Sequence, residues 1–163
     1  MTWIWRKIDS FLGAAVIAAS GVAASQAQAF IVQYIQRLGG HLDEASAHLN
    51  NVQNGLRYKL MSETVRKELE TDAQARVDTL SGAYHAIADT NIFFKPIAFL
   101  RHADPAIVSG TWRDFVPSLS ASADSIVAII IAMILGFLIY EVVKLPVVAI
   151  TQGAPRKKFR RRG

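Results

Sequence analysis

Residues 10–36 decide the fold, because they carry no Asp, Glu, Lys or Arg and read SFLGAAVIAASGVAASQAQAFIVQYIQ. A second uncharged run, residues 125–140, reads SIVAIIIAMILGFLIY. A helix rises about 1.5 Å per residue, so about 20 apolar residues cross the hydrocarbon core of a bilayer. The two runs predict an all-α membrane protein with transmembrane helices over residues 11–35 and 119–144. Pro146 is expected to end the second helix.

The first apolar run has a second interpretation, as a cleaved signal peptide. A basic segment precedes it, and Ala27-Gln28-Ala29 has the small-x-small spacing that signal peptidase accepts. The apolar run nevertheless continues through Ile31 and Ile35, beyond that cleavage point. We therefore favour an uncleaved transmembrane helix.

Charge is unevenly distributed along the 163 residues, whose formal net charge is +5. Residues 37–124 contain nine basic and eleven acidic side chains, whereas residues 145–163 contain six basic and no acidic ones. Lys and Arg are retained on the cytoplasmic side of a membrane. We therefore expect a multi-pass protein of the bacterial inner membrane, with cytoplasmic termini at residues 1–10 and 145–163 and a periplasmic domain at residues 36–118.

A set of aromatic and basic residues is expected to anchor the chain at the membrane surfaces. Tryptophan favours the interface, and clustered Lys and Arg bind anionic lipids. The set is Trp3, Trp5, Trp112, Arg156, Lys157, Lys158, Arg160, Arg161 and Arg162. We expect no nucleic-acid partner, because the sequence shows no folded nucleic-acid-binding domain beside the basic tail.

Apolar side chains recur every three or four residues between the two spans, as on one face of a helix. The first stripe is Phe30, Tyr34, Leu38, Leu42, Ala45, Leu49, Val52 and Leu56, and the second is Val65, Leu69, Ala73, Val77, Leu80, Tyr84 and Ile87. Asn54-Gly55 marks a break, and Ser62 is a suitable N-cap for the second helix. The two helices should form an extracytoplasmic antiparallel hairpin.

Residues 92–100 are too apolar for a free loop. Beyond them, Pro105 and Pro117 bracket a short segment that contains Trp112 and Phe115. We expect a short membrane-proximal helix that closes the base of the hairpin or lies along the membrane surface. Whether lipid or pigment binds the 92–100 segment stays open.

The sequence contains no catalytic motif. It has no cysteine, P-loop, GxSxG or GxGxxG pattern. His41, Glu44 and His48 share a helical face and are weak candidates for a metal site, but a solvated polar face is the favoured interpretation. We expect no cofactor, no metal and no enzymatic activity.

Small side chains recur every four residues on both predicted spans, a spacing that lets helix backbones approach closely. They are Ala15, Ala19, Ala23 and Ala27 on the first span and Ala128, Ala132 and Gly136 on the second. We favour a seam within one chain, with a homo-oligomer interface as the alternative.

A polar face begins where the first helix leaves the predicted membrane. It comprises Gln33, Tyr34, Arg37, Gly39, Gly40, His41 and Glu44, and the paired glycines suggest a kink or a close helix contact. Polar groups at that depth need polar partners. A partner protein is one source, and an internal contact from Arg37 to Asp114 or Asp124 is the other.

Residues 30–45 read FIVQYIQRLGGHLDEA, and the pattern Q-x-Y-x-Q-R-L-G-G-H-x-D-E within them is the most specific feature of the chain. It resembles the start of a family of small proteobacterial inner-membrane proteins, the domain of unknown function 2937 (DUF2937). Residues 112–117 and the glycine-containing helix at 135–140 are similar in type and position. The resemblance covers about residues 5–145, excludes the basic tail and departs in the Ala-rich run before Phe30. It implies a two-span protein with a helical middle and supplies no mechanism.

Two functions are compatible with these features. The leading hypothesis is a non-catalytic accessory or assembly subunit that packs against other integral membrane subunits of a larger inner-membrane complex. The alternative is a periplasmic sensing or ligand-binding module that signals through a separate output protein.

Overall fold

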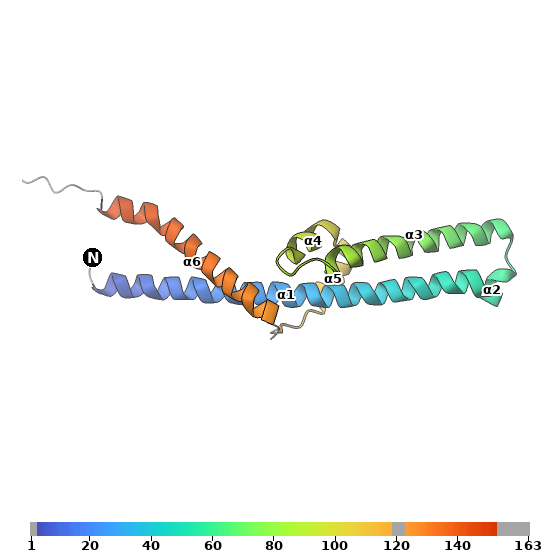
Figure 1. The fold of residues 1–163 in the computed structure, drawn as a ribbon, viewed down its shortest axis with the longest axis horizontal. Coiled ribbons are helices and arrows are strands. Elements are labelled where there is room, and N and C mark those ends of the chain that lie inside the picture. The colour runs from blue at the N-terminus through green and yellow to red at the C-terminus, as the bar shows by residue number, and fades with distance from the viewer. Residues whose placement is uncertain (1–2, 119–122, 153–163) are drawn as a thin grey trace, which may run out of the picture. The chain divides into compact units, whose positions relative to one another are not determined.

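The computed structural model describes residues 3–118 and 123–152. All regular elements in these ranges are helices: α1 (Trp3–Asn54), α2 (Leu56–Lys59), α3 (Glu63–Ala88), α4 (Lys95–His102), α5 (Pro105–Arg113) and α6 (Ala123–Gln152) (Figure 1). The chain divides into two compact units. Unit 1 takes residues 1–24 and 129–163, and unit 2 takes residues 25–128.

The helix boundaries near the middle of the chain follow from local chemistry. α1 ends at Asn54, and a Cβ atom on Gly55 would overlap the backbone oxygen of Asn51, so glycine is needed for the tight turn. The predicted N-cap of α3 is confirmed, since the Ser62 hydroxyl accepts a hydrogen bond from the Val65 N–H at 3.5 Å.

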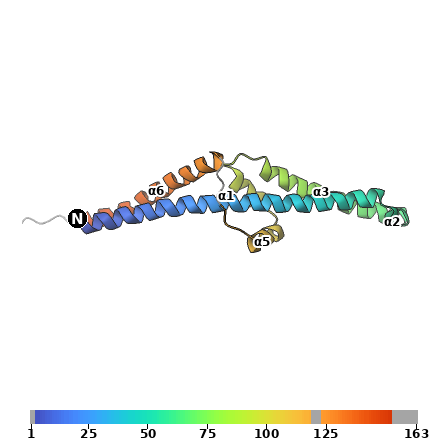
Figure 2. The same ribbon diagram turned by 90° about the horizontal axis from the view of Figure 1, so that it is seen from below.

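Unit 2 has an apolar core of the kind found in water-soluble domains. Its buried cluster is Ile31, Tyr34, Leu38, Ile87 and Ile107, with Val52, Ala45 and Ala73 buried elsewhere in the unit. The predicted stripes supply most of the buried residues on α1 and α3, but Ile31 is buried and lies outside the first stripe. Gln53 Nε2 donates to Glu70 Oε1 at 2.8 Å, and α3 lies beside the 25–54 part of α1 (Figures 1 and 2).

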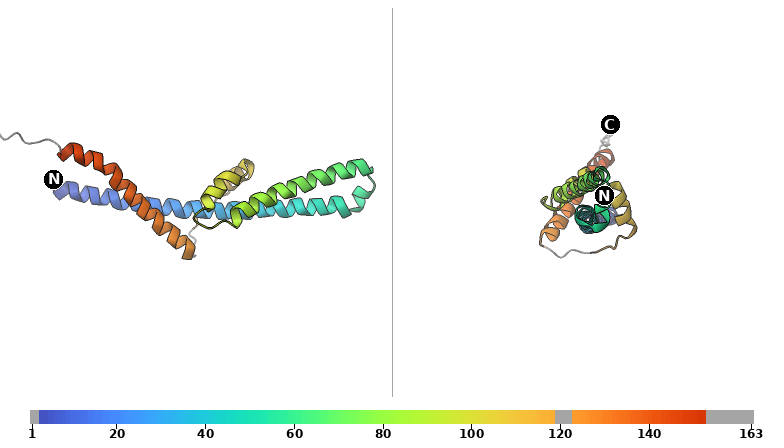
Figure 3. Two further views of the ribbon diagram at one scale, coloured as in Figure 1. Left: turned by 45° about the horizontal axis from the view of Figure 1, so that its top comes forward. Right: turned by 90° about the vertical axis from the view of Figure 1, so that its right-hand side faces the viewer.

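α5 flanks α1 on another side (Figures 2 and 3). Asp104 begins this helix by accepting hydrogen bonds from the N–H groups of Ala106 and Ile107, at 2.7 and 3.3 Å. The Asp104 N–H in turn donates to the Tyr34 hydroxyl at 2.8 Å. The start of α5 is therefore fixed directly to a buried residue of α1.

An aromatic cluster surrounds Phe30 in unit 2. The ring centroids of Phe99, Trp112 and Phe115 lie 5.9, 5.8 and 5.5 Å from that of Phe30, all in edge-to-face arrangements. Such pairs are favourable for aromatic rings. Trp112 also stacks with Phe115 at a centroid distance of 6.5 Å, yet it stays 73% exposed.

In unit 1, α1 and α6 approach closely at glycines. A Cβ atom on Gly21 would lie 2.9 Å from Cγ of Met133, and one on Gly136 would overlap the Ser20 hydroxyl. The Ser20 hydroxyl is satisfied within α1, since it donates to the Val16 carbonyl at 2.9 Å. Glycine therefore permits a helix contact that any larger residue would push apart.

The face of α1 used in this contact differs from the predicted alanine stripe. Gly136 is buried and Ala128 and Ala132 are half-buried, but the α1 stripe of Ala15, Ala19, Ala23 and Ala27 is exposed. Gly21 and Ser20 take its place. Alanine spacing gave the wrong face because glycine lets backbones approach more closely than alanine does.

Two helices are long and apolar enough to cross a membrane, by length and composition: Lys7–Asn54 and Ser125–Leu145. α6 also continues through Pro146 to Gln152, which corrects the predicted end of this helix. Proline removes one helical hydrogen bond and can kink a helix, but the following residues can continue it.

Candidate functional site

A groove of about 760 Å³ opens between α1, α3 and α5 within unit 2. Its lining includes four side chains that carry or can carry positive charge: Arg37, His41, Arg76 and Arg113. Asp104 also lines it, but its Oδ1 atom is engaged by the first N–H groups of α5. The groove therefore has an excess of positive charge.

Arg37 is held against α5. Its Nη1 donates to Asp114 Oδ2 at 2.9 Å, and the two side chains are 34% and 63% exposed. A Cβ atom on Gly110 would lie 3.2 Å from Nε and Cζ of Arg37, so the guanidinium packs on the glycine backbone. An ion pair this exposed contributes about 0–1 kcal/mol, so its main effect is to orient the guanidinium.

Arg76 and Arg113 differ from Arg37 in having no acidic partner. Both are exposed, and neither forms an ion pair with an acidic side chain in the described part of the chain. Two guanidinium groups therefore line the groove without an ion-pair partner among the described residues.

The polar face predicted at the end of the first span is largely satisfied inside unit 2. Gln33 Nε2 donates to the Val116 carbonyl at 2.7 Å, and its Oε1 accepts from the Val116 N–H at 3.2 Å. Tyr34 is fully buried, and its hydroxyl is bonded to Asp104. Together with the Arg37–Asp114 ion pair, these bonds show that Gln33, Tyr34 and Arg37 find polar partners within the chain. They therefore support the internal contact over a partner protein at these three residues.

The other members of that face are less engaged. A Cβ atom on Gly39 would lie 3.5 Å from the Tyr84 ring, whereas Gly40 has open space around it. α1 runs unbroken through both glycines. His41 Nδ1 is 3.8 Å from Glu44 Oε2, with side chains 40% and 75% exposed.

The weak metal candidates do not gather into a site. His48 is exposed, as is Glu44. Within residues 3–118 and 123–152, no group of three or more His, Cys, Asp or Glu side chains is placed to hold a metal ion.

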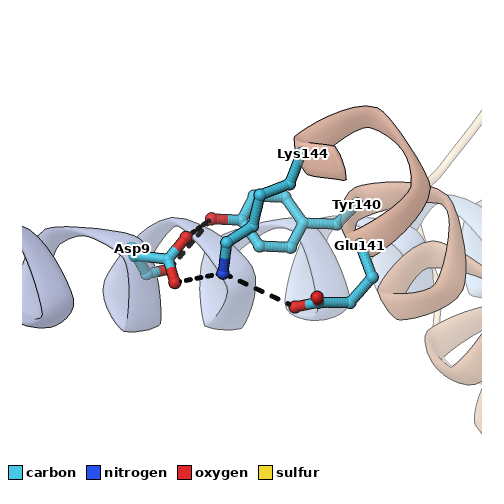
Figure 4. Close-up of polar contacts among 4 residues, drawn as sticks. All are labelled: Asp9, Tyr140, Glu141 and Lys144. Atoms are coloured by element: carbon cyan, nitrogen blue, oxygen red, sulfur yellow. Dashed lines mark hydrogen bonds and ion pairs between the residues drawn. The ribbon is translucent and has the colours of Figure 1, made fainter. Parts of the chain in front are cut away.

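Unit 1 contains a polar cluster between the start of α1 and the end of α6 (Figure 4). Asp9 Oδ1 accepts from the Tyr140 hydroxyl at 2.7 Å, and Asp9 Oδ2 pairs with Lys144 Nζ. Lys144 Nζ also lies 3.9 Å from Glu141 Oε1. Because Asp9 is near the first turn of α1 and Lys144 near the last turns of α6, the two helices run antiparallel in this unit.

The sequence pattern of one protein family, described as "Protein of unknown function (DUF2937)", matches residues 8–55 and 63–152. The chain belongs to this family. Neither a curated protein nor a solved structure matches it.

The DUF2937 match includes every residue of the two sites. Asp9, Tyr140 and Lys144 lie within it, as do Arg37, Arg76 and Arg113. Of the predicted anchoring residues, Trp112 lies inside the match and Trp3, which is 66% exposed, lies before it. The tail residues Arg156, Lys157, Lys158, Arg160, Arg161 and Arg162 and the side chain of Trp5 lie outside the described residues.

Sequence reasoning missed two features of this DUF2937 chain. It gave no partner to Asp9, although Asp9 is the one acidic residue before the first apolar run and would meet Lys144 if the spans were antiparallel. It also gave no role to Arg76 and Arg113. The α1 residues that line the groove with them, Arg37 and His41, are 35 or more positions away, so no local spacing marks them.

Proposed function

We propose that this DUF2937 protein spans the bacterial inner membrane twice, with cytoplasmic termini and a periplasmic hairpin formed by α1 and α3. Large apolar side chains on unit 1 support this proposal, since Phe11 is 75% exposed and Ile139 63% exposed. Lipid would cover such surface. The Asp9–Lys144 pair supports the placement of the start of α1 and the end of α6 on the same side of the membrane.

Reporter fusions test this topology. Alkaline phosphatase should be active when fused at Gly82 and inactive when fused at Gly163, because the enzyme needs the periplasm to form its disulfides. The opposite pattern would reverse the proposed orientation, and activity at both sites would contradict two spans.

Within that membrane we propose a non-catalytic accessory or assembly subunit of a larger complex. The observation that carries this proposal is the uncovered alanine stripe of unit 1. Ala15, Ala19 and Ala23 are exposed although α1 packs against α6 through Gly21 and Ser20. Small residues at four-residue spacing let the backbone of another helix approach closely. A surface that faces only lipid gains little from such spacing. A helix of another integral membrane subunit suits this face.

A pair of leucine substitutions tests the stripe. Ala19→Leu should reduce co-purification of other subunits and lower the mass of the complex in mild detergent, because the larger side chain holds the partner helix away. Ala14→Leu makes the same change at an exposed residue about 140° around α1 from Ala19, so it is the matched control and should keep the complex. A complex that survives Ala19→Leu unchanged would remove this face from the interface.

The mass of the complex separates two versions of the proposal. A homo-oligomer would have a mass that is a multiple of 17.9 kDa per chain, whereas a hetero-complex would contain other polypeptides. A wild-type protein that is monomeric in every mild detergent would contradict both versions.

The second candidate function is a sensing or ligand-binding module, and the groove of unit 2 favours it. Three arginines and a histidine around one groove suit a small anionic ligand. A sensor would bind that ligand without other subunits present, and its output would need a separate protein.

A further inference from the structure

Three arginines from three different helices meet at one groove. Arg37 comes from α1, Arg76 from α3 and Arg113 from α5. Guanidinium groups present planar sets of N–H donors that match the oxygens of phosphate, and Arg is preferred where several such donors converge on one anion. Arg37 is already oriented by Asp114 and Gly110, so one wall of the groove is preformed.

The charges facing the groove favour an anion. Asp104 is bonded to the N-terminus of α5, and Asp114 is bonded to Arg37. Arg76 and Arg113 have no ion-pair partner in the described part of the chain. Glu44 also lies near the groove: its Oε2 is 3.8 Å from His41 Nδ1, and it lines a smaller pocket together with Arg76.

The position of the groove along α1 indicates where the anion comes from. Phe30 contacts Phe99, Trp112 and Phe115, and aromatic rings with an exposed tryptophan mark a membrane–water interface. Arg37 follows Ile35, the last residue of the predicted span, by two positions, which is about 3 Å along a helix. Lipid headgroups occupy roughly 5–8 Å beyond the hydrocarbon core, so the proposed span places Arg37 among the headgroups.

We propose that this groove binds a phosphate group, with the headgroup of a membrane phospholipid as its main source and free phosphate as the other. This inference goes beyond the accessory role, and its lipid source rests on the proposed membrane placement. The phosphate would bridge Arg76 and Arg113, with Arg37 as a third donor.

Ligand-dependent stabilisation of the full chain in a neutral detergent tests the proposal. The probes are inorganic phosphate, dihexanoyl phosphatidylglycerol and dihexanoylglycerol, which has the same acyl chains without phosphate. Phosphatidylglycerol should raise the unfolding midpoint in a saturable way, and dihexanoylglycerol should not. Saturable stabilisation by inorganic phosphate with no further gain from the lipid would identify free phosphate as the source.

Matched arginine substitutions locate the site. Arg76→Gln and Arg113→Gln should each weaken the apparent affinity by roughly tenfold, since a charge-assisted hydrogen bond is lost. Arg66→Gln on α3 and Arg101→Gln on α4 remove the same charge outside the groove and should leave the affinity within about twofold, a limit set by weak screened long-range effects.

Three outcomes would overturn the proposal: no saturable stabilisation by either phosphate probe, equal stabilisation by dihexanoylglycerol, or equal affinity losses in the groove and control variants. Failure of the proposed topology would appear separately, in the reporter fusions at Gly82 and Gly163. Loss of complex formation in Ala19→Leu is likewise independent, because Ala19 belongs to unit 1 and the groove to unit 2.

Discussion

Units 1 and 2 are both helical, but they hold their helices together in different ways. Unit 2 buries large side chains, with Tyr34, Leu38, Val52 and Ile87 all fully buried. Unit 1 instead brings α1 and α6 together at Gly21 and Gly136, and it exposes most of its large apolar residues. In water the hydrophobic effect favours the burial of large apolar side chains, as in unit 2. In lipid, helices associate through close backbone packing and polar contacts, as in unit 1. The difference supports the proposal that unit 1 lies in lipid and unit 2 in water.

The polar contacts of the two units follow the same division. In unit 1 one cluster, Asp9 with Tyr140 and Lys144, joins the two helices at one end. In unit 2 polar bonds occur at several points along the outside of an apolar core, as between Gln53 and Glu70. If the comparison is right, core truncation should matter most in unit 2 and the addition of a methyl group should matter most in unit 1.

The largest expected effect comes from truncating the core of unit 2. Leu38→Ala should lower the free energy of unfolding by about 2–5 kcal/mol, because it removes a fully buried side chain and leaves a cavity. Chemical denaturation followed by circular dichroism measures this loss. Leu60→Ala makes the same change at a position 90% exposed and should cost under about 0.5 kcal/mol. Equal losses in the two variants would mean that Leu38 does not belong to a packed apolar core in unit 2.

The next effect comes from adding one methyl group to unit 1. Gly136→Ala should destabilise the α1–α6 contact by about 1–3 kcal/mol, because the new Cβ overlaps Ser20. Gly40→Ala is the matched control: its Cβ meets nothing within 4 Å, and it should stabilise α1 by about 0.5–1 kcal/mol.

A disulfide reports on that contact directly, since the natural chain has no cysteine. Gly21→Cys with Met133→Cys should form a bond within one chain, because these residues touch in unit 1. Adding Gly136→Ala should lower its yield, and adding Ala19→Leu should not. A disulfide that forms between chains alone would show that the α1–α6 contact is intermolecular.

A smaller effect is expected at the polar end of unit 1. Asp9→Asn removes the negative partner of Lys144 and should lower the unfolding midpoint in detergent, by less than Gly136→Ala does. The exchange Asp9→Lys with Lys144→Asp should recover most of the loss, because it restores the pair with reversed polarity. Asp43→Asn, at an exposed position of α1, should leave the midpoint unchanged. An exchange variant less stable than Asp9→Asn would contradict a direct interaction.

The smallest effect concerns Arg37 and Asp114, whose side chains are more exposed than those of the Asp9–Lys144 pair. A double-mutant cycle with Arg37→Ala and Asp114→Ala should give a coupling of about 0.2–1 kcal/mol. Unfolding in denaturant measures all four proteins of the cycle. A coupling of zero would leave Arg37 oriented by its packing on Gly110 alone.

Much of the helical architecture could be predicted because it depends on local pattern. Three- and four-residue spacing placed Tyr34, Leu38 and Ile87 on buried faces, and Ser62 marked the start of α3 by its own hydrogen-bonding chemistry. The uncharged runs alone identified the two helices that are long and apolar enough to cross a membrane. Family membership was likewise readable from one short run, residues 30–45.

The tertiary structure decided which groups meet across the chain. In the structure Gly21 and Ser20, and not the alanine stripe, contact α6. Arg37 pairs with Asp114, and Arg76 and Arg113 line one groove. The physical reason is that a sequence specifies each helix face through neighbours three or four residues away, whereas the rotation and approach of two helices depend on how all their facing side chains fit together. Contacts between residues 77 or 135 positions apart, as in Arg37–Asp114 and Asp9–Lys144, are therefore set by packing and not by any local motif.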